Sequence, residues 1–201
     1  MGKPVRKELV LASGSPFRRR LLEAAGVPIT VRPADVDEPA VRSRLDGVSP
    51  ANVATALAGA KAEAVSALLP QTLVIGADQV LALGNSILSK PRDLAEARRQ
   101  LLLLRGKPHD LPTGVVLALA GKVVWRHLEM PRLTVRNFSD EFLERYLVEC
   151  GEGVCQTVGA YAIEGRGVQL FERIEGDIFT IIGLPLLPLL TELRCRGALD
   201  A

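Results

Sequence analysis

The feature that most constrains the fold is the segment 72–77, TLVIGA, a nearly continuous apolar run that ends at the carboxylate of Asp78. Apolar residues at consecutive positions, rather than at alternate ones, indicate a strand that is buried on both faces of its sheet. The run also places an acid at the carboxyl end of a buried strand, where α/β sheets hold their ligands. A layered α/β chain with a site near Asp78 is therefore expected.

The segments around this strand supply covering helices and further strands. Capping residues predict helices that begin at Ser15, Ser49, Asp93 and Ser139. Helices and strands alternate at first and strands then cluster, which predicts an α/β fold with a mixed sheet. Residues 35–50 are expected to form a loop. Strands are expected at 8–12, 28–34, 113–121, 122–130, 132–138, 160–164, 168–174 and 178–182, and a C-terminal helix at 184–195.

The totals exclude several classes of protein. The chain has 201 residues, a formal net charge of +2 and three cysteines without a C-x-x-C pair. The length fits one domain, residues 1–201, and the odd number of cysteines argues against a disulfide framework. The low charge argues against a nucleic-acid partner, and the lack of a signal segment or a long apolar run argues against a membrane partner. We expect a cytoplasmic enzyme.

Residues 13–20, SGSPFRRR, combine a predicted helix start with three arginines. The dipole of a helix disfavours cations at the N-terminus, so the arginines need a reason to be there. A glycine between two serines offers backbone N–H and hydroxyl donors, and guanidinium groups pair well with phosphate. The segment therefore suggests a polyphosphate site. An ordinary Ser-Pro cap followed by a solvated basic face is the alternative, and it is the commoner origin of so short a motif.

Four further features suggest chemistry with phosphates. Asp78 follows the buried strand, Lys61 interrupts a stretch of small apolar residues, Lys90 precedes a helix, and residues 35–38, DVDE, group oxygen ligands of the kind that divalent cations prefer. Each has a simpler explanation as a turn cap, a lysine extended to solvent or a charged loop. No P-loop, HExxH or GxSxG motif is present. Together the features favour phosphate binding, a metal and an acid that activates water.

The order of motifs resembles the Maf family of nucleoside triphosphate pyrophosphatases over nearly the whole chain. The resemblance implies an elongated α/β fold with two lobes around a deep cleft, and cleavage of a nucleoside triphosphate between the α- and β-phosphates with a divalent cation, Mg or Mn. The matching segments are LASGSPFRRRLL, DVDE, AKAEA, VIGADQV, SKPRD, GKPHDLPTGV, GAYAIEGRG and IEGDIFTIIGLPL.

The resemblance also implies roles for single residues. Asp78 would accept the proton of the attacking water and, with Glu38, hold the metal. Lys61 and Lys90 would neutralise phosphate charge. The residues implied to hold the phosphates are Ser13, Ser15, Arg18 and Arg19.

Three positions bear on the base. Phe17, Gln79 and Glu164 stand where the family's dTTP/UTP type has Arg, Thr and Gln, so the chain is closer to the 7-methyl-GTP type. N7-methylated guanine is cationic, stacks on an aromatic ring, and donates hydrogen bonds that a carboxylate accepts. Residues 156–158, QTV, depart from the lysine and alanine that the family often has there, which puts triphosphate affinity in question.

Two alternatives remain open. One is a dTTP/UTP pyrophosphatase, and the other is a non-catalytic nucleotide-binding regulator of cell division. A pure binding module has no need of the acid that activates water, so the joint presence of Glu38, Lys61, Asp78 and Lys90 favours an enzyme. Dimers occur in the family, so the resemblance includes a homodimer among the expected assemblies.

Overall fold

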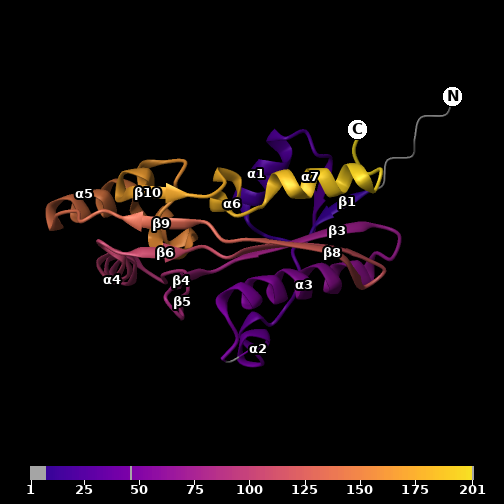
Figure 1. Cartoon of the computed structure of the whole chain (residues 1–201), viewed down its shortest axis with the longest axis horizontal. Helices are drawn as coiled ribbons and strands as arrows, with labels where there is room; N and C mark the ends of the chain where they lie inside the picture. The colour runs from indigo at the N-terminus through magenta and orange to yellow at the C-terminus, as the bar shows by residue number, and fades with distance from the viewer. Residues whose placement is uncertain (1–7, 46, 201) are drawn as a thin grey trace.

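Two sheets that lie end to end give the molecule its elongated shape (Figure 1). The structure is a computed structural model, and it describes residues 8–45 and 47–200. The five-stranded first sheet has the order β2-β1-β3-β7-β8, with β1 Leu9–Leu11, β2 Ile29–Val31, β3 Leu73–Gln79, β7 Thr113–Leu119 and β8 Lys122–Glu129. The five-stranded second sheet has the order β10-β9-β6-β4-β5, with β4 Leu81–Leu83, β5 Ser86–Leu88, β6 Pro108–Asp110, β9 Arg132–Val135 and β10 Phe171–Glu175.

The first sheet is mixed and the second is antiparallel. Strand β1 pairs in parallel with β2 and β3, whereas β3, β7 and β8 pair antiparallel. Three stretches of chain run from one sheet into the other: Val80 alone separates β3 from β4, residues 111–112 separate β6 from β7, and residues 130–131 separate β8 from β9. The predicted elongated mixed α/β fold is confirmed, and its strands divide into two sheets at these junctions.

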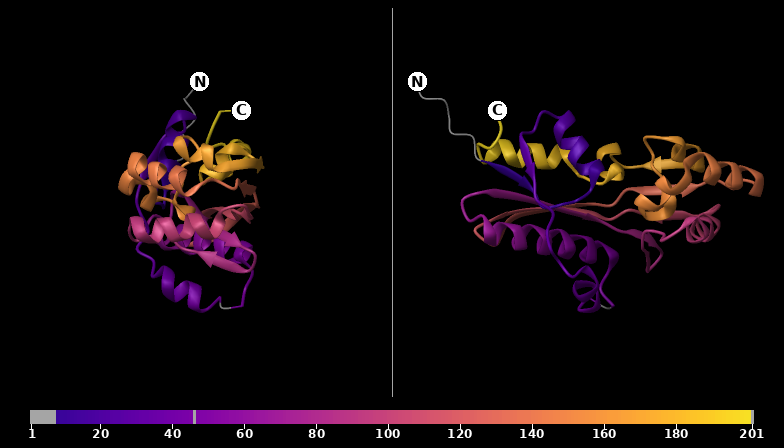
Figure 2. Two further views of the ribbon diagram at one scale, coloured as in Figure 1. Left: turned by 90° about the vertical axis from the view of Figure 1, so that its left-hand side faces the viewer. Right: turned by 180° about the vertical axis from the view of Figure 1, so that it is seen from behind.

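Helices cover both faces of the first sheet, as the apolar run of β3 predicts (Figure 1; Figure 2). Helix α3 (Pro50–Leu68) packs on one face of β3 and β7, where Val74 and Val65 share a buried cluster. Helices α1 (Pro16–Ala24) and α7 (Leu186–Cys195) lie on the opposite face, where Leu22 and Leu189 join Ile75 in another cluster. Strand β3 is therefore buried between two helical layers.

Helix α3 approaches β3 so closely that only glycine fits at position 76. A Cβ atom built on Gly76 would lie 2.2 Å from the carbonyl oxygen of Ala58 and 2.8 Å from Cβ of Ala62. Both neighbours belong to α3, one on each side of Lys61 in the sequence. The missing side chain of Gly76 thus sets the distance between the helix that carries Lys61 and the strand that carries Asp78.

The second sheet has its own core. Helices α4 (Leu94–Leu104) and α5 (Asp140–Cys150) and the 3-10 turns Gly151–Gln156, Val158–Ala160 and Arg166–Leu170 surround it. Leu101, Leu133 and Phe138 lie in one buried cluster with residues of these turns. Within residues 8–45 and 47–200, no helix is both long and apolar enough to cross a bilayer.

The predicted helix starts are confirmed. The side chains of Ser15, Ser49, Asp93 and Ser139 each accept a hydrogen bond from a backbone N–H three residues later, and a helix begins directly after each of them. The C-terminal helix begins two residues later than expected, at Leu186.

Several other predictions are wrong. Residues 178–182 form a helix, α6 (Ile178–Ile182), because Asp177 caps the N–H of Thr180 and Gly183 ends it at φ +132°. Residues 35–50 are not all loop, since Asp37 caps a short helix, α2 (Glu38–Ser43). Residues 160–164 form no strand, and of residues 168–174 only those from Phe171 on do so. The short strands β4, β5 and β6 were not predicted.

Candidate active site

A cavity of about 690 Å³ opens where the two sheets meet. Its lining includes the end of β3 and the junction residues Val80 and Leu111. The predicted site residues come to it from segments spread between positions 13 and 164. All of them except Arg19 line it: Ser13, Ser15, Phe17, Arg18, Glu38, Lys61, Asp78, Gln79, Lys90 and Glu164.

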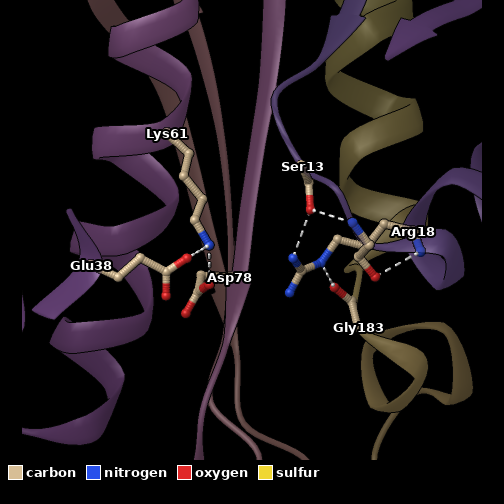
Figure 3. A network of polar contacts seen from close by, with 7 residues as sticks. Ser13, Arg18, Glu38, Lys61, Asp78 and Gly183 are labelled. Atoms are coloured by element: carbon tan, nitrogen blue, oxygen red, sulfur yellow. Dashed lines mark hydrogen bonds and ion pairs between the residues drawn. The ribbon is translucent and has the colours of Figure 1, made fainter. Parts of the chain in front are cut away.

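One wall of the cavity holds two carboxylates that share one ammonium group (Figure 3). Nζ of Lys61 lies 2.6 Å from Oδ1 of Asp78 and 2.7 Å from Oε1 of Glu38. Helix α3 carries the lysine, β3 carries the aspartate, and α2 begins with the glutamate. Exposed fractions of 12% for the Lys61 side chain and 8% for that of Asp78 make this a mostly buried pair, which water screens little.

The two carboxylates differ in their surroundings. Burial tends to raise the pKa of Glu38, but the hydrogen bond and charge of Lys61, with the charges of Arg42 and Arg18, outweigh it and lower the pKa. Glu38 is therefore ionised at neutral pH. Oδ2 of Asp78 is buried and has no hydrogen-bond partner among the described residues. An unpaired buried acceptor is costly, so this atom is suited to receive a water or a cation.

The opposite wall is built around Arg18 (Figure 3). Its Nε donates to the carbonyl oxygen of Gly183 at 2.8 Å, and its Nη1 donates to Oγ of Ser13 at 3.0 Å. Burial lowers the pKa of Arg18, while the charges of Asp78 and Glu38 act in the opposite direction. The buried arginine thus joins the first loop of the chain to the end of α6 and presents positive charge to the cavity.

Ser15 and Lys90 complete this part of the site. Oγ of Ser15 accepts the backbone N–H of Arg18 at 3.5 Å, so the hydroxyl caps α1 while it lines the cavity. Lys90 lines the cavity and remains partly exposed to solvent. Partial burial lowers the pKa of its ammonium group, and the positive charges of Arg18 and Lys61 lower it further. Another anion at this place would stabilise the charged lysine.

The other two arginines of the opening helix point elsewhere. Arg19 lies outside the cavity lining and forms an exposed ion pair with Glu23 at 2.7 Å. The guanidinium of Arg20 lies 4.9 Å from the ring centroid of Phe17 and 4.0 Å from Oε1 of Glu164. The structure therefore brings Arg18, rather than the whole triplet, into the site.

Gln79 has its amide orientation fixed by its neighbours. Its Nε2 donates to Oγ1 of Thr113 at 2.9 Å and to the carbonyl oxygens of Thr180 and Ile181 at 3.0 and 3.2 Å. Carbonyl oxygens only accept hydrogen bonds, so the NH2 group must face them. The carbonyl oxygen of the Gln79 side chain is then the atom left for a ligand, and the Glu164 carboxylate is a second acceptor in the lining of the cavity.

The two carboxylates of the first wall fit a divalent cation. Mg²⁺ in proteins takes one or two carboxylates and completes its shell with water and substrate phosphates. The described residues contain no group of three or more His, Cys, Asp or Glu side chains placed to hold a metal, so the DVDE segment does not act as a three-carboxylate cluster. Asp37 in that segment caps α2 instead. Glu38 and the unpaired Oδ2 of Asp78 are the available donors.

Sequence reasoning missed several residues of the site. Arg42 lines the cavity from α2, a helix that was expected to be loop. Tyr161 lines it too, and its hydroxyl lies 2.6 Å from Nε2 of the buried His109. Gly183, whose carbonyl oxygen accepts a hydrogen bond from Arg18, lies 165 positions after that arginine in the sequence. Recognising residues 38–43 as a helix would have indicated Arg42, because a helix places Arg42 one turn after Glu38 on the same side.

Known proteins resemble this chain over nearly its full length. The profile of the family described as Maf-like protein matches residues 8–196. The 7-methyl-GTP pyrophosphatase of Mesorhizobium japonicum is 51% identical over 196 residues, which cover 96% of this chain and 98% of that protein. The 7-methyl-GTP pyrophosphatase of Rhizobium meliloti is 51% identical with the same coverage, and the nucleoside triphosphate pyrophosphatase of Rhodospirillum rubrum is 51% identical, covering 95% of this chain and 96% of that protein.

Proposed function

The chain belongs to the family of Maf-like proteins, and on that ground we propose that it is a nucleoside triphosphate pyrophosphatase. The reaction is hydrolysis of the bond between the α- and β-phosphates, which yields a nucleoside monophosphate and pyrophosphate. The relatives named for this activity support the proposal, since half of their residues are identical to those of this chain across nearly the full length.

The observation that carries the proposal is the arrangement of Asp78. Lys61 holds one of its carboxylate oxygens, and the other is buried without a partner among the described residues. A fixed carboxylate with a free oxygen is suited to accept the proton of a water that attacks phosphorus while the bridging P–O bond breaks. Pyrophosphate then leaves with the bridging oxygen, and the proton passes from the carboxylate to solvent.

Positive groups on both walls support the binding of a triphosphate. Arg18 lies on one side, Lys61 on the other, and Lys90 at the opening. Phosphoryl transfer depends mainly on positioning and on neutralising charge, so such a frame supplies much of what the reaction needs. Ser13 and Ser15 keep the arginine and the helix start in place.

A divalent cation completes the proposed site. Glu38 and Asp78 would hold it, and the phosphates and water would supply its other ligands. When bound, the ion would neutralise charge on the phosphate oxygens. Lys61 already compensates part of the charge of these two carboxylates, so they stay close together without the ion.

The base is proposed to be 7-methylguanine. Gln79 and Glu164 offer acceptors at the cavity. Guanine presents two adjacent donors, N1–H and N2–H, whereas thymine and uracil present the single donor N3–H between the acceptors O2 and O4. The ring of Phe17 lines the same cavity and is suited to stack on a cationic base. The guanidinium of Arg20 is itself a planar cation, and it lies over the ring of Phe17 and beside the carboxylate of Glu164. This supports the idea that Phe17 and Glu164 together suit a planar cationic base.

The experiment is pyrophosphate release from a panel of 7-methyl-GTP, GTP, dTTP, UTP and CTP, with Mg²⁺, with Mn²⁺ and with a chelator. Release that is fastest with 7-methyl-GTP and stops on chelation is the expected result. Fastest release from dTTP and UTP refutes the base assignment but keeps the enzyme. Nucleotide binding without release from any substrate favours a regulator. The cytoplasm is the compartment in which we propose the activity.

A further inference from the structure

Arg42 is a cation in the cavity wall without a hydrogen-bond or ion-pair partner among the described residues. It lines the cavity from α2 and is half-buried. Its side chain makes no hydrogen bond or ion pair with any residue in 8–45 or 47–200. We propose that Arg42 is a further substrate-binding residue, which pairs with phosphate oxygens of the triphosphate on the Glu38 side of the cavity. The inference rests on the proposed function and adds a phosphate ligand to it.

The arginines of α1 have partners, and this contrast singles out Arg42. Arg18 uses two of its nitrogens on Ser13 and Gly183, Arg19 pairs with Glu23, and Arg20 lies at Phe17 and Glu164. A guanidinium presents five N–H donors in a planar fork that matches two phosphate oxygens at once. Among the described residues of this wall, Arg42 on α2 is therefore the guanidinium whose fork has no hydrogen-bond or ion-pair partner.

The charge of the wall shows why a cation is needed there. Glu38 and Asp78 together carry two negative charges, and Lys61 supplies one positive charge between them. A wall with a net negative charge repels a polyphosphate. Arg42 brings these four groups to neutrality before any metal binds, and it acts on Glu38 closely enough to help lower the pKa of that carboxyl.

Helix α2 carries both the Glu38 carboxylate and the Arg42 guanidinium to the same wall of the cavity. Glu38 and Arg42 are four residues apart, so they lie on the same side of the helix, and Pro39 between them also lines the cavity. Asp37 fixes the start of this helix by accepting the N–H of Ala40 at 2.9 Å. A phosphate oxygen on the Glu38 side of the cavity would then face the side of α2 that carries Arg42.

The test compares Arg42→Ala with Arg44→Ala, a matched control two residues away. Arg44 ends the same helix, is exposed and does not line the cavity. The assays are pyrophosphate release, which gives KM and kcat, and calorimetric titration with inorganic pyrophosphate, which needs no turnover. For Arg42→Ala we expect KM and the Kd for pyrophosphate to rise about tenfold or more, with kcat changed less than about threefold. Arg44→Ala should stay within about twofold of the wild type, and Arg42→Lys should recover part of the loss.

Each outcome separates the inference from the proposed function. If the wild type releases no pyrophosphate from any nucleotide, the proposed function fails, and the calorimetric comparison alone decides whether Arg42 binds phosphate. If the wild type is active and Arg42→Ala matches Arg44→Ala in both assays, the inference is overturned. A change in kcat and its pH profile without a change in KM or Kd also overturns it, since Arg42 then acts through Glu38. Arg42→Gln, which keeps part of the aliphatic stem and a polar end without the charge, replaces Arg42→Ala if circular dichroism shows that the latter does not fold.

Discussion

Replacing Gly76 with alanine tests whether the packing of α3 on β3 sets the catalytic geometry. The new Cβ would lie 2.2 Å from the carbonyl oxygen of Ala58 and 2.9 Å from the backbone nitrogen of Ala62, both in the backbone of α3. Ordinary contacts between such atoms exceed 3 Å, so helix and strand must separate by about 1 Å. Overpacking of this kind costs about 3 kcal/mol of unfolding free energy, which for a chain of this length lowers Tm by about 6–12 °C.

The same separation moves Lys61 away from Asp78, now 2.6 Å apart, and a misplacement of that size slows catalysis by about 10- to 100-fold. The control is Gly59→Ala in the same helix, because a Cβ built there meets no described residue within 4 Å and alanine favours the helix. Thermal unfolding and steady-state kinetics of both variants are the measurements. If Gly76→Ala unfolds at the wild-type temperature with unchanged kcat, the close approach of α3 does not control the site.

Three further predictions follow from single side chains. Asp78→Asn should lower kcat by about 10²- to 10⁴-fold while the Kd for nucleotide measured without a divalent cation changes little, and near-normal turnover would remove Asp78 from the role of proton acceptor. Glu164→Gln should lower the ratio of kcat/KM for 7-methyl-GTP to that for dTTP by about tenfold, and an unchanged ratio in the substrate panel would contradict its contact with the base. Burial lowers the pKa of His109 to about 4, so the unfolded chain takes up a proton below about pH 6.5 that the folded chain refuses. Stability should therefore fall by about 3 kcal/mol between pH 6.5 and 4 in urea titrations, and His109→Gln, which can still bond to Tyr161, should abolish most of that fall. Equal pH dependence of the two proteins would show that other groups cause it.

Local signals account for the parts of the fold that the sequence predicts. A capping side chain such as Ser49 or Asp93 bonds to a backbone N–H three residues away, so the helix start is encoded within one turn. The burial of β3 on both faces is likewise visible in its own composition. Helix α6 shows where such local signals mislead. Its β-branched residues favour a strand, but Asp177 caps the start of a single helical turn and Gly183, at positive φ, ends it.

The candidate site depends on contacts that no local pattern contains. The sequence places Arg18 and Arg19 side by side, but only the direction of α1 relative to Gly183 decides that the first enters the cavity and the second meets solvent. The polar, turn-rich composition of residues 35–50 predicts a loop, so nothing local singles out Arg42. Its place at the site depends on α2 facing the cavity. The pairing of Lys61 with Asp78 depends on Gly76, whose neighbours lie in another element.

The strands that pass from one sheet into the other make the two halves of the molecule mechanically dependent on each other. Because β3 continues into β4 through Val80 alone, neither half can lose its sheet without fraying strands of the other, and we expect denaturant to unfold the chain in one cooperative step. The cavity lies on that shared seam. A cavity-creating substitution of Phe138, which does not line the site, should then reduce the fraction of molecules that are active, while each molecule that remains folded turns over at the normal rate.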